Sequence, residues 1–148
     1  MKVLELFAGT RSIGKAFESK RHEVYSIEWD KNFKNINWYV DIGTITTQDI
    51  LDKFGIPDVI WSSFDCTSYS IAGISHHRKK EEDGNLIPIS DYAKFCDKVN
   101  THVINLINEL LKLNPNMLYF IENPRGGLRK MNFMKELPRY TITYCQYM

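Results

Sequence analysis

Short apolar runs alternate along the chain with stretches in which apolar residues recur every three or four positions. The runs predict strands, because polar or turn-forming residues bound each of them and each is too short for a helix. The expected strands cover residues 2–7, 22–28, 38–42, 59–61, 117–121 and 140–147. Helical spacing predicts helices over residues 12–20, after Thr46 or Thr47, and from Ser90 to just before Pro115. This alternation indicates an α/β fold with a doubly wound, mostly parallel sheet.

The stretch 58–70, which reads DVIWSSFDCTSYS, changes character halfway along. Its first half is apolar, and its second half consists mainly of small hydroxyl residues with one thiol, Cys66. Ligands of an open parallel sheet bind beyond the carboxyl ends of the strands, so Cys66 is placed for chemistry. Most free cysteines are simply buried packing residues. The role of Cys66 therefore depends on which other residues share that edge.

Residues 70–89 follow without a clear apolar period and include the mixed-charge run HHRKKEED. About twenty residues is long for a connection inside a compact domain. We expect a loop that is either functional or disordered.

The composition, with 148 residues, 43% hydrophobic and 25% charged, suits one globular domain with a real core. The net charge of +1 predicts no broad basic field. Three cysteines without paired spacing indicate a reducing compartment and argue against a disulfide framework or a zinc site. No apolar run approaches the roughly 20 residues of a membrane span, and no signal peptide is recognisable. We expect a cytoplasmic protein with no membrane partner.

Gly9 follows the first predicted strand, and Glu28 ends the second, nineteen residues later. A glycine turn with an acid at this spacing is typical of nucleoside cofactor sites, where the acid accepts from the ribose hydroxyls. Residues 9–15 also match GxxxxGK, the pattern of a phosphate-binding loop. That pattern requires Ser or Thr after the lysine to bind Mg²⁺, and Ala16 stands there, which disfavours this alternative.

Several segments resemble, in their order and strand placement, the motifs of DNA cytosine-5 methyltransferases, specifically the phage-type branch. Residues 6–9 followed by 14–17 resemble the first motif, residues 63–66 the motif that carries the nucleophile, and residues 122–124 the Glu-Asn-Pro motif. The resemblance implies a Rossmann-like, S-adenosylmethionine-dependent methyltransferase fold. It also implies transfer of a methyl group from S-adenosylmethionine to carbon 5 of cytosine in DNA.

The same resemblance implies a role for individual residues. Cys66 would be the nucleophile, forming a covalent adduct, and Glu122 the acid that holds the base. The implied cofactor-binding residues are Phe7, Ala8, Gly9, Thr10, Arg11, Ser12, Glu28, Trp29, Asp41, Ile42 and Ser63. The implied substrate-binding residues are Asn123, Pro124, Arg125, Ser70 and Arg78. Residues 70–89 would form a lid over the extruded base, with Arg78, Lys79 and Lys80 near phosphates.

The chain departs from the family pattern in three ways. Arg11 replaces a glycine, Asp65 replaces the proline before the nucleophile, and the target-recognition region of the family is absent. Residues 1–148 are therefore interpreted as a single, C-terminally incomplete methyltransferase domain that binds DNA weakly.

Alternatives follow from these departures. The chain could be a non-catalytic fragment that binds the cofactor or a partner chain. The apolar edge expected at 140–147 predicts a homodimer, or a second polypeptide that completes the domain. An exocyclic-amine methyltransferase fits less well, because its Asp/Asn-Pro-Pro-aromatic signature is absent at 64–67.

Overall fold

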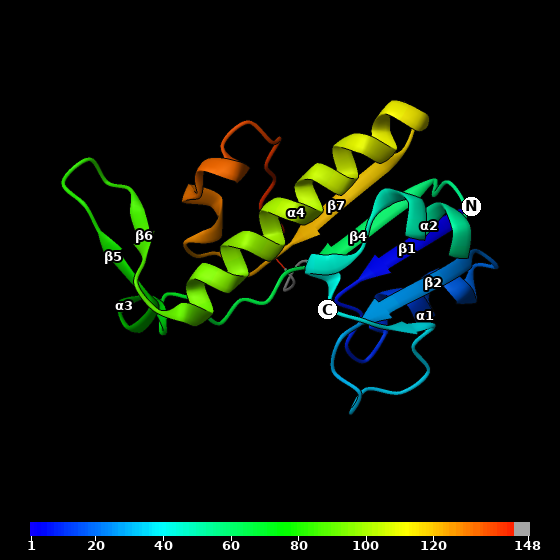
Figure 1. Cartoon of the computed structure of the whole chain (residues 1–148), viewed down its shortest axis with the longest axis horizontal. Coiled ribbons are helices and arrows are strands. Elements are labelled where there is room, and N and C mark those ends of the chain that lie inside the picture. The colour runs from blue at the N-terminus through cyan, green and yellow to red at the C-terminus, as the bar shows by residue number, and fades with distance from the viewer. Residues whose placement is uncertain (144–148) are drawn as a thin grey trace.

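The computed structural model describes residues 1–143, and its centre is a sheet of five parallel strands in the order β3-β2-β1-β4-β7 (Figure 1). Helices lie on both faces of this sheet, which confirms the predicted α/β class and the doubly wound arrangement. The strands are β1 (Lys2–Leu6), β2 (Glu23–Glu28), β3 (Trp38–Tyr39), β4 (Val59–Ser63) and β7 (Leu118–Glu122).

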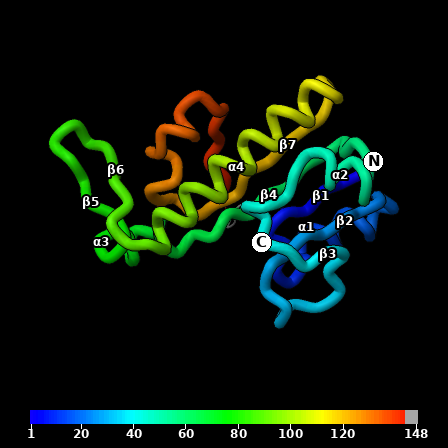
Figure 2. Tube along the Cα trace, in the orientation of Figure 1, coloured from blue at the N-terminus to red at the C-terminus, as the bar shows by residue number. Residues whose placement is uncertain are grey.

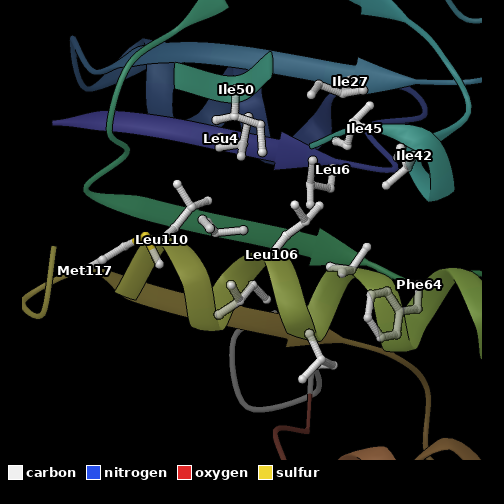
Figure 3. Packing of buried hydrophobic residues seen from close by; sticks show 14 of the residues in the cluster. Leu4, Leu6, Ile27, Ile42, Ile45, Ile50, Phe64, Leu106, Leu110 and Met117 are labelled. Atoms are coloured by element: carbon white, nitrogen blue, oxygen red, sulfur yellow. The ribbon is translucent and has the colours of Figure 1, made fainter. Parts of the chain in front are cut away.

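Two helices, α2 (Thr47–Lys53) and α4 (Asp91–Leu113), cover one face of the sheet and bury the main core. Figure 3 shows Leu4 and Leu6 of β1 directed toward Leu106 and Leu110 of α4. Both helices begin at the residues that the sequence indicates. Thr46 forms a capping box with Asp49, and the hydroxyl of Ser90 accepts from the N–H of Ala93 at 3.1 Å.

The opposite face is covered by α1 (Ser12–Ser19), which packs against β1 and β2. The contact includes a buried carboxylate, since Glu5 is 2% exposed and accepts from the N–H of Gly14 at 2.8 Å and from the hydroxyl of Ser26 at 2.7 Å. The N–H of Gly14 is thus donated to Glu5 rather than left free for a phosphate. The geometry therefore gives no support to the GxxxxGK interpretation.

The prediction of an irregular loop over residues 70–89 is wrong. This segment contains the short helix α3 (Ile74–His77) and an antiparallel hairpin of β5 (Arg78–Lys80) and β6 (Leu86–Pro88). The hairpin projects from the N-terminal end of α4, away from the sheet (Figure 1). Its base is joined to α4 because Nδ1 of His77 lies 2.8 Å from the hydroxyl of Ser90.

Two 3₁₀ turns, η2 (Leu128–Lys130) and η3 (Asn132–Met134), follow β7 after Gly126 and Gly127. Figure 2 shows this stretch in orange, between the hairpin and the far end of α4. Contact with the hairpin is direct, because Nζ of Lys135 lies 3.4 Å from Oδ1 of Asn85.

Two strand predictions need correction. The strand expected over 38–42 is limited to Trp38–Tyr39, because Asp41 accepts from the N–H of Gly43 at 2.9 Å and starts the 3₁₀ turn η1 (Ile42–Thr44). Of the strand expected over 140–147, residues 140–143 are not in a strand, and the rest lies outside the described residues. None of the helices within residues 1–143 is long and apolar enough to cross a membrane.

Candidate functional site

The carboxyl ends of the parallel strands meet at one edge of the sheet and bring most of the predicted site residues together. In register, Leu6 lies beside Ile27 and Ser62, and Ser63 lies beside Glu122. The turns that follow these positions form the region in which an open parallel sheet binds its ligands.

The turn after β1 has an unusual backbone. Phe7, Gly9 and Arg11 have φ of 56°, 50° and 59°, in the left-handed region that glycine tolerates best. The positive φ of Arg11 is the backbone conformation that suits the glycine found at this position in the pattern of the family that the chain resembles. The N–H of Ala8 donates to the carbonyl of Ile27 at 3.2 Å, which holds this turn against the end of β2.

Arg11 points its side chain into the protein rather than toward a ligand. Its Nε donates to the hydroxyl of Ser26 at 2.8 Å and lies 3.9 Å from the carboxylate of Glu5. Its guanidinium also pairs with Glu18. Only the backbone of Arg11 is therefore placed to contact a cofactor.

Glu28 is held at the end of β2 by three backbone groups. Its carboxylate accepts from the N–H of Gly9 at 2.9 Å, of Trp29 at 2.8 Å and of Asp30 at 3.1 Å. The Oε2 atom accepts only the bond from Gly9 among the described residues, so it keeps a lone pair for a ligand hydroxyl. The neighbouring indole of Trp29 is 66% exposed and offers a flat apolar surface.

Asp41 and Ile42 lie at the next strand end, after β3. One carboxylate oxygen of Asp41 caps η1, whereas the side chain of Ile42 is 2% exposed and belongs to the core. In this region the carboxylate of Glu28 can accept from hydroxyl groups, and the turn at Gly9 lets the backbone approach a ligand closely. The exposed indole of Trp29 provides a surface on which a ring can stack. Those groups fit a nucleoside.

Cys66 begins the turn that follows β4. Its carbonyl accepts from the N–H of Tyr69 at 3.0 Å and of Ser70 at 2.8 Å, and its side chain is half-buried. The carboxylate of the preceding Asp65 accepts from the N–H of Thr67 at 2.7 Å. Burial raises the pKa of Asp65, but hydrogen bonds from Thr67 and Tyr92 outweigh burial and hold that pKa below its usual value.

Glu122 ends β7 beside Ser63, and Asn123 fastens this strand end to the cysteine turn. The Nδ2 of Asn123 donates to the carbonyl of Phe64 at 2.8 Å. Its Oδ1 is buried and has no hydrogen-bond partner within residues 1–143. The pairing of β4 with β7 and the hydrogen bond from the Asn123 side chain bring the turn of Cys66 to the same edge of the sheet as the half-buried carboxylate of Glu122.

Arg78 lies elsewhere than the sequence suggests. Its side chain is fully buried, donating from Nε to the carbonyl of Ser68 at 2.9 Å and through both terminal nitrogens to Asp97 at 2.7 and 2.8 Å. It also lies 4.2 Å from the centre of the Tyr69 ring. Burial lowers the pKa of Arg78, but the carboxylate of Asp97 outweighs it and raises the pKa. The guanidinium is occupied, so the expected contact of Arg78 with a phosphate is incorrect.

Sequence reasoning missed Asp97, Tyr69 and Asn100 as members of this buried network. The phenol of Tyr69 donates to Asp97 at 2.7 Å and accepts from Nδ2 of Asn100 at 2.8 Å. Burial and the neighbouring carboxylate raise the pKa of Tyr69. A signal was present, since Asp97 and Asn100 interrupt the apolar stripe of α4 at helical spacing.

The remaining expected residues lie near the same edge. Ser63 and Ser70 are half-buried, whereas Pro124 and Arg125 are exposed at the start of the connection to η2. Ser63 accepts from the indole N–H of Trp61 at 3.1 Å.

Comparison with known proteins identifies the family of the chain. The model of the family described as C-5 cytosine-specific DNA methylase matches residues 1–114. The chain is also similar to Type II methyltransferase M.Bsp6I of Bacillus sp. (strain RFL6), at 34% identity over 96 residues. That match covers 58% of this chain and 29% of the relative. Members of the family use S-adenosylmethionine as methyl donor. The chain belongs to the C-5 cytosine-specific DNA methylase family.

Proposed function

We propose that the chain is the cofactor-binding and catalytic portion of a methyltransferase that modifies carbon 5 of cytosine in DNA through a covalent adduct on Cys66. The observation that supports this most directly is the link between Asn123 and Phe64, which joins the turn of Cys66 to the strand end carrying Glu122. The nucleophile and the acid then act on one base.

The chemistry requires both groups. Carbon 5 of cytosine becomes nucleophilic after the thiolate of Cys66 adds to carbon 6. Glu122 holds nitrogen 3 of the ring and supplies the proton that neutralises the charge formed on addition. When bound, S-adenosylmethionine supplies the methyl group that carbon 5 accepts. Loss of the carbon 5 proton then restores the ring double bond and releases the Cys66 thiolate.

The proposed cofactor contacts come from the turn after β1 and from two strand ends. Oε2 of Glu28 would accept from the ribose hydroxyls, and the backbone of residues 7–12 would hold the methionine part. Asp41, the backbone of Ile42 and the indole of Trp29 would hold the adenine. Ser63, the last residue of β4, would complete the set.

The covalent step has a direct test. DNA containing 5-fluorocytosine should trap an adduct with the chain and S-adenosylmethionine, because fluorine cannot leave as the proton does. Peptide mass spectrometry should place the adduct on Cys66 and on neither Cys96 nor Cys145. Cys96 is the matched control, since it is 6% exposed and burial raises the pKa of its thiol.

The alternative is a non-catalytic fragment that binds the cofactor or a partner chain. It is favoured by the match to less than a third of the length of the relative. Binding of S-adenosylmethionine without an adduct, under conditions in which the DNA is bound, would establish this alternative. In either case the proposed place of action is the cytoplasm, where a restriction–modification enzyme meets its DNA.

A further inference from the structure

Charge is unevenly distributed along the chain, although the total is nearly neutral. Residues 124–148 contain five Lys and Arg and one Glu, a net charge of +4, so the residues before them carry a net charge of −3. The basic part begins directly after the Glu-Asn-Pro segment. It therefore follows the strand end that carries Glu122.

Residues 125–130 of this basic segment form one wall of a groove of about 700 Å³. Three of its cations, Arg125, Arg129 and Lys130, line the groove together with Lys80 of the hairpin. Arg78 also lines the groove, but its guanidinium is paired with Asp97 and is not counted with these four. No Asp or Glu is among the described residues that line the groove, and none of the four cations forms an ion pair within residues 1–143. The apolar lining comes from Ile71, Ile74 and Leu86.

The groove lies against the turn that Cys66 begins. The N–H of Gly127 donates to the carbonyl of Tyr69 at 2.7 Å, and a Cβ on Gly126 would clash with that carbonyl. Two glycines thus let the connection after β7 pack directly on the cysteine turn. Arg125 follows Glu122 by three residues, and Ile71 follows Cys66 by five, so the groove is lined by residues close along the chain to both candidate catalytic residues.

The geometry points to this groove as the binding site for the sugar–phosphate backbone of the DNA strand that flanks the extruded cytosine. This inference rests on the proposed function and specifies where its substrate lies. Arginine forks and lysine ammonium groups pair with phosphate oxygens, and such contacts position a strand without reading its sequence. The apolar lining packs against deoxyribose carbons and base faces. Extrusion of a base costs free energy, because it breaks stacking and pairing. Contacts to the neighbouring sugar–phosphate backbone offset this cost and hold the strand in the extruded conformation.

The test is the salt dependence of DNA binding, measured by fluorescence anisotropy with a labelled duplex and no cofactor. Four phosphate contacts correspond to a slope of log K against log salt of about −3.6. Replacing two cations, as Lys80→Gln with Lys130→Gln, should reduce that slope by about 1.8. Arg125→Gln with Arg129→Gln should have the same effect.

The matched control is Lys20→Gln with Lys112→Gln, since both lysines are exposed and neither lines the groove. The control should keep the slope of the unmodified chain. An equal loss of slope in the control and groove variants, or an unchanged slope in the groove variants, would overturn the inference. Tighter binding of an RNA duplex of the same sequence would overturn the assignment to DNA.

The outcome separates this inference from the proposed function. Groove-dependent DNA binding without the Cys66 adduct would keep the groove and reject the catalytic proposal. Adduct formation with groove variants that retain the full slope would keep the catalytic proposal and reject the groove.

Discussion

Glu28 lies at the end of β2 with its carboxylate fixed by three backbone N–H groups, one of which comes from the turn after β1. This arrangement couples the shape of the glycine turn to the position of the acid. A ligand hydroxyl that bonds to Oε2 therefore meets an acceptor whose direction is already set. Such preorganisation reduces the entropy that binding must overcome.

Glu28→Ala should weaken the binding of S-adenosylmethionine, or of its demethylated product, by about 1–3 kcal/mol, the scale of a hydrogen bond to a charged group. Isothermal titration calorimetry measures this directly. Glu23→Ala is the control, because Glu23 lies exposed at the other end of the same strand. Unchanged affinity for Glu28→Ala, or binding of ATP with Mg²⁺ in place of the methyl donor, would contradict the assigned role.

Two arginines show which site residues a sequence can place and which it cannot. The motif around Arg11 and the basic run around Arg78 both suggested ligand contacts, yet each guanidinium is directed inward. The partners responsible are distant in sequence: Ser26 for Arg11 and Asp97 for Arg78. Pairing of this kind depends on how the helices pack on the sheet. The helical spacing marks Asp97 as a polar residue in an apolar stripe, but it does not identify the partner of Asp97. The sequence does place three residues at strand ends, because each lies at or just after the end of a strand with a clear apolar run. These residues are Glu28, Cys66 and Glu122.

At the scale of elements, periodicity predicts the parallel sheet and α4 well, but it misses the hairpin of β5 and β6. Each strand of this hairpin has only three residues, and β5 (Arg78–Lys80) consists of cations, so the hairpin shows no apolar alternation. A turn signal was nevertheless present, since Asp83-Gly84 is a frequent hairpin pair and Gly84 has φ of 86°. The turn η1 at the end of the strand expected over 38–42 was also missed. An Asp that caps a turn, such as Asp41, cannot be distinguished by sequence from an Asp at the end of a strand.

The ion pair of Arg78 and Asp97 connects three elements: the hairpin, the cysteine turn and α4. Arg78→Met should cost about 3–5 kcal/mol of unfolding free energy, because it removes the cation paired with Asp97 and the donor to the carbonyl of Ser68, and leaves Asp97 with only the phenol of Tyr69. The double variant Arg78→Met with Asp97→Leu should lose less than Arg78→Met alone, since it removes both charges together. Urea denaturation of the single and double variants gives the coupling energy.

The exposed pair of Lys94 and Asp91 provides the control for this cycle. Its atoms are 3.9 Å apart and the side chain of Lys94 is 60% exposed, so its removal should leave the urea midpoint unchanged. A coupling energy for Arg78 and Asp97 as small as that of the control would mean that the network does not stabilise the hairpin.

At the scale of the whole molecule, the two faces of the sheet are covered unequally. The face with α2 and α4 is closed, whereas α1 lies over β1 and β2 and leaves the outer face of β4 and β7 more open. Trp61 and Phe120 stack there with ring centres 5.3 Å apart. Phe120 is 44% and Leu118 56% exposed. β7 is also an edge strand of the sheet among the described residues.

An apolar edge strand pairs readily with a second copy of itself, because the two strands can meet antiparallel across a two-fold axis. We expect the chain to sediment as a concentration-dependent dimer that forms through β7 of each copy. Leu118→Lys with Phe120→Lys should return it to a monomer, since two charges per copy would face each other in the interface. Ile56→Lys with Ile87→Lys is the control, because both residues are exposed apolar side chains outside β7. Sedimentation equilibrium distinguishes the cases, with thermal unfolding to show that each variant is folded. A monomer at every concentration, or a dimer that persists in the Leu118 and Phe120 variant, would show that β7 is not the contact.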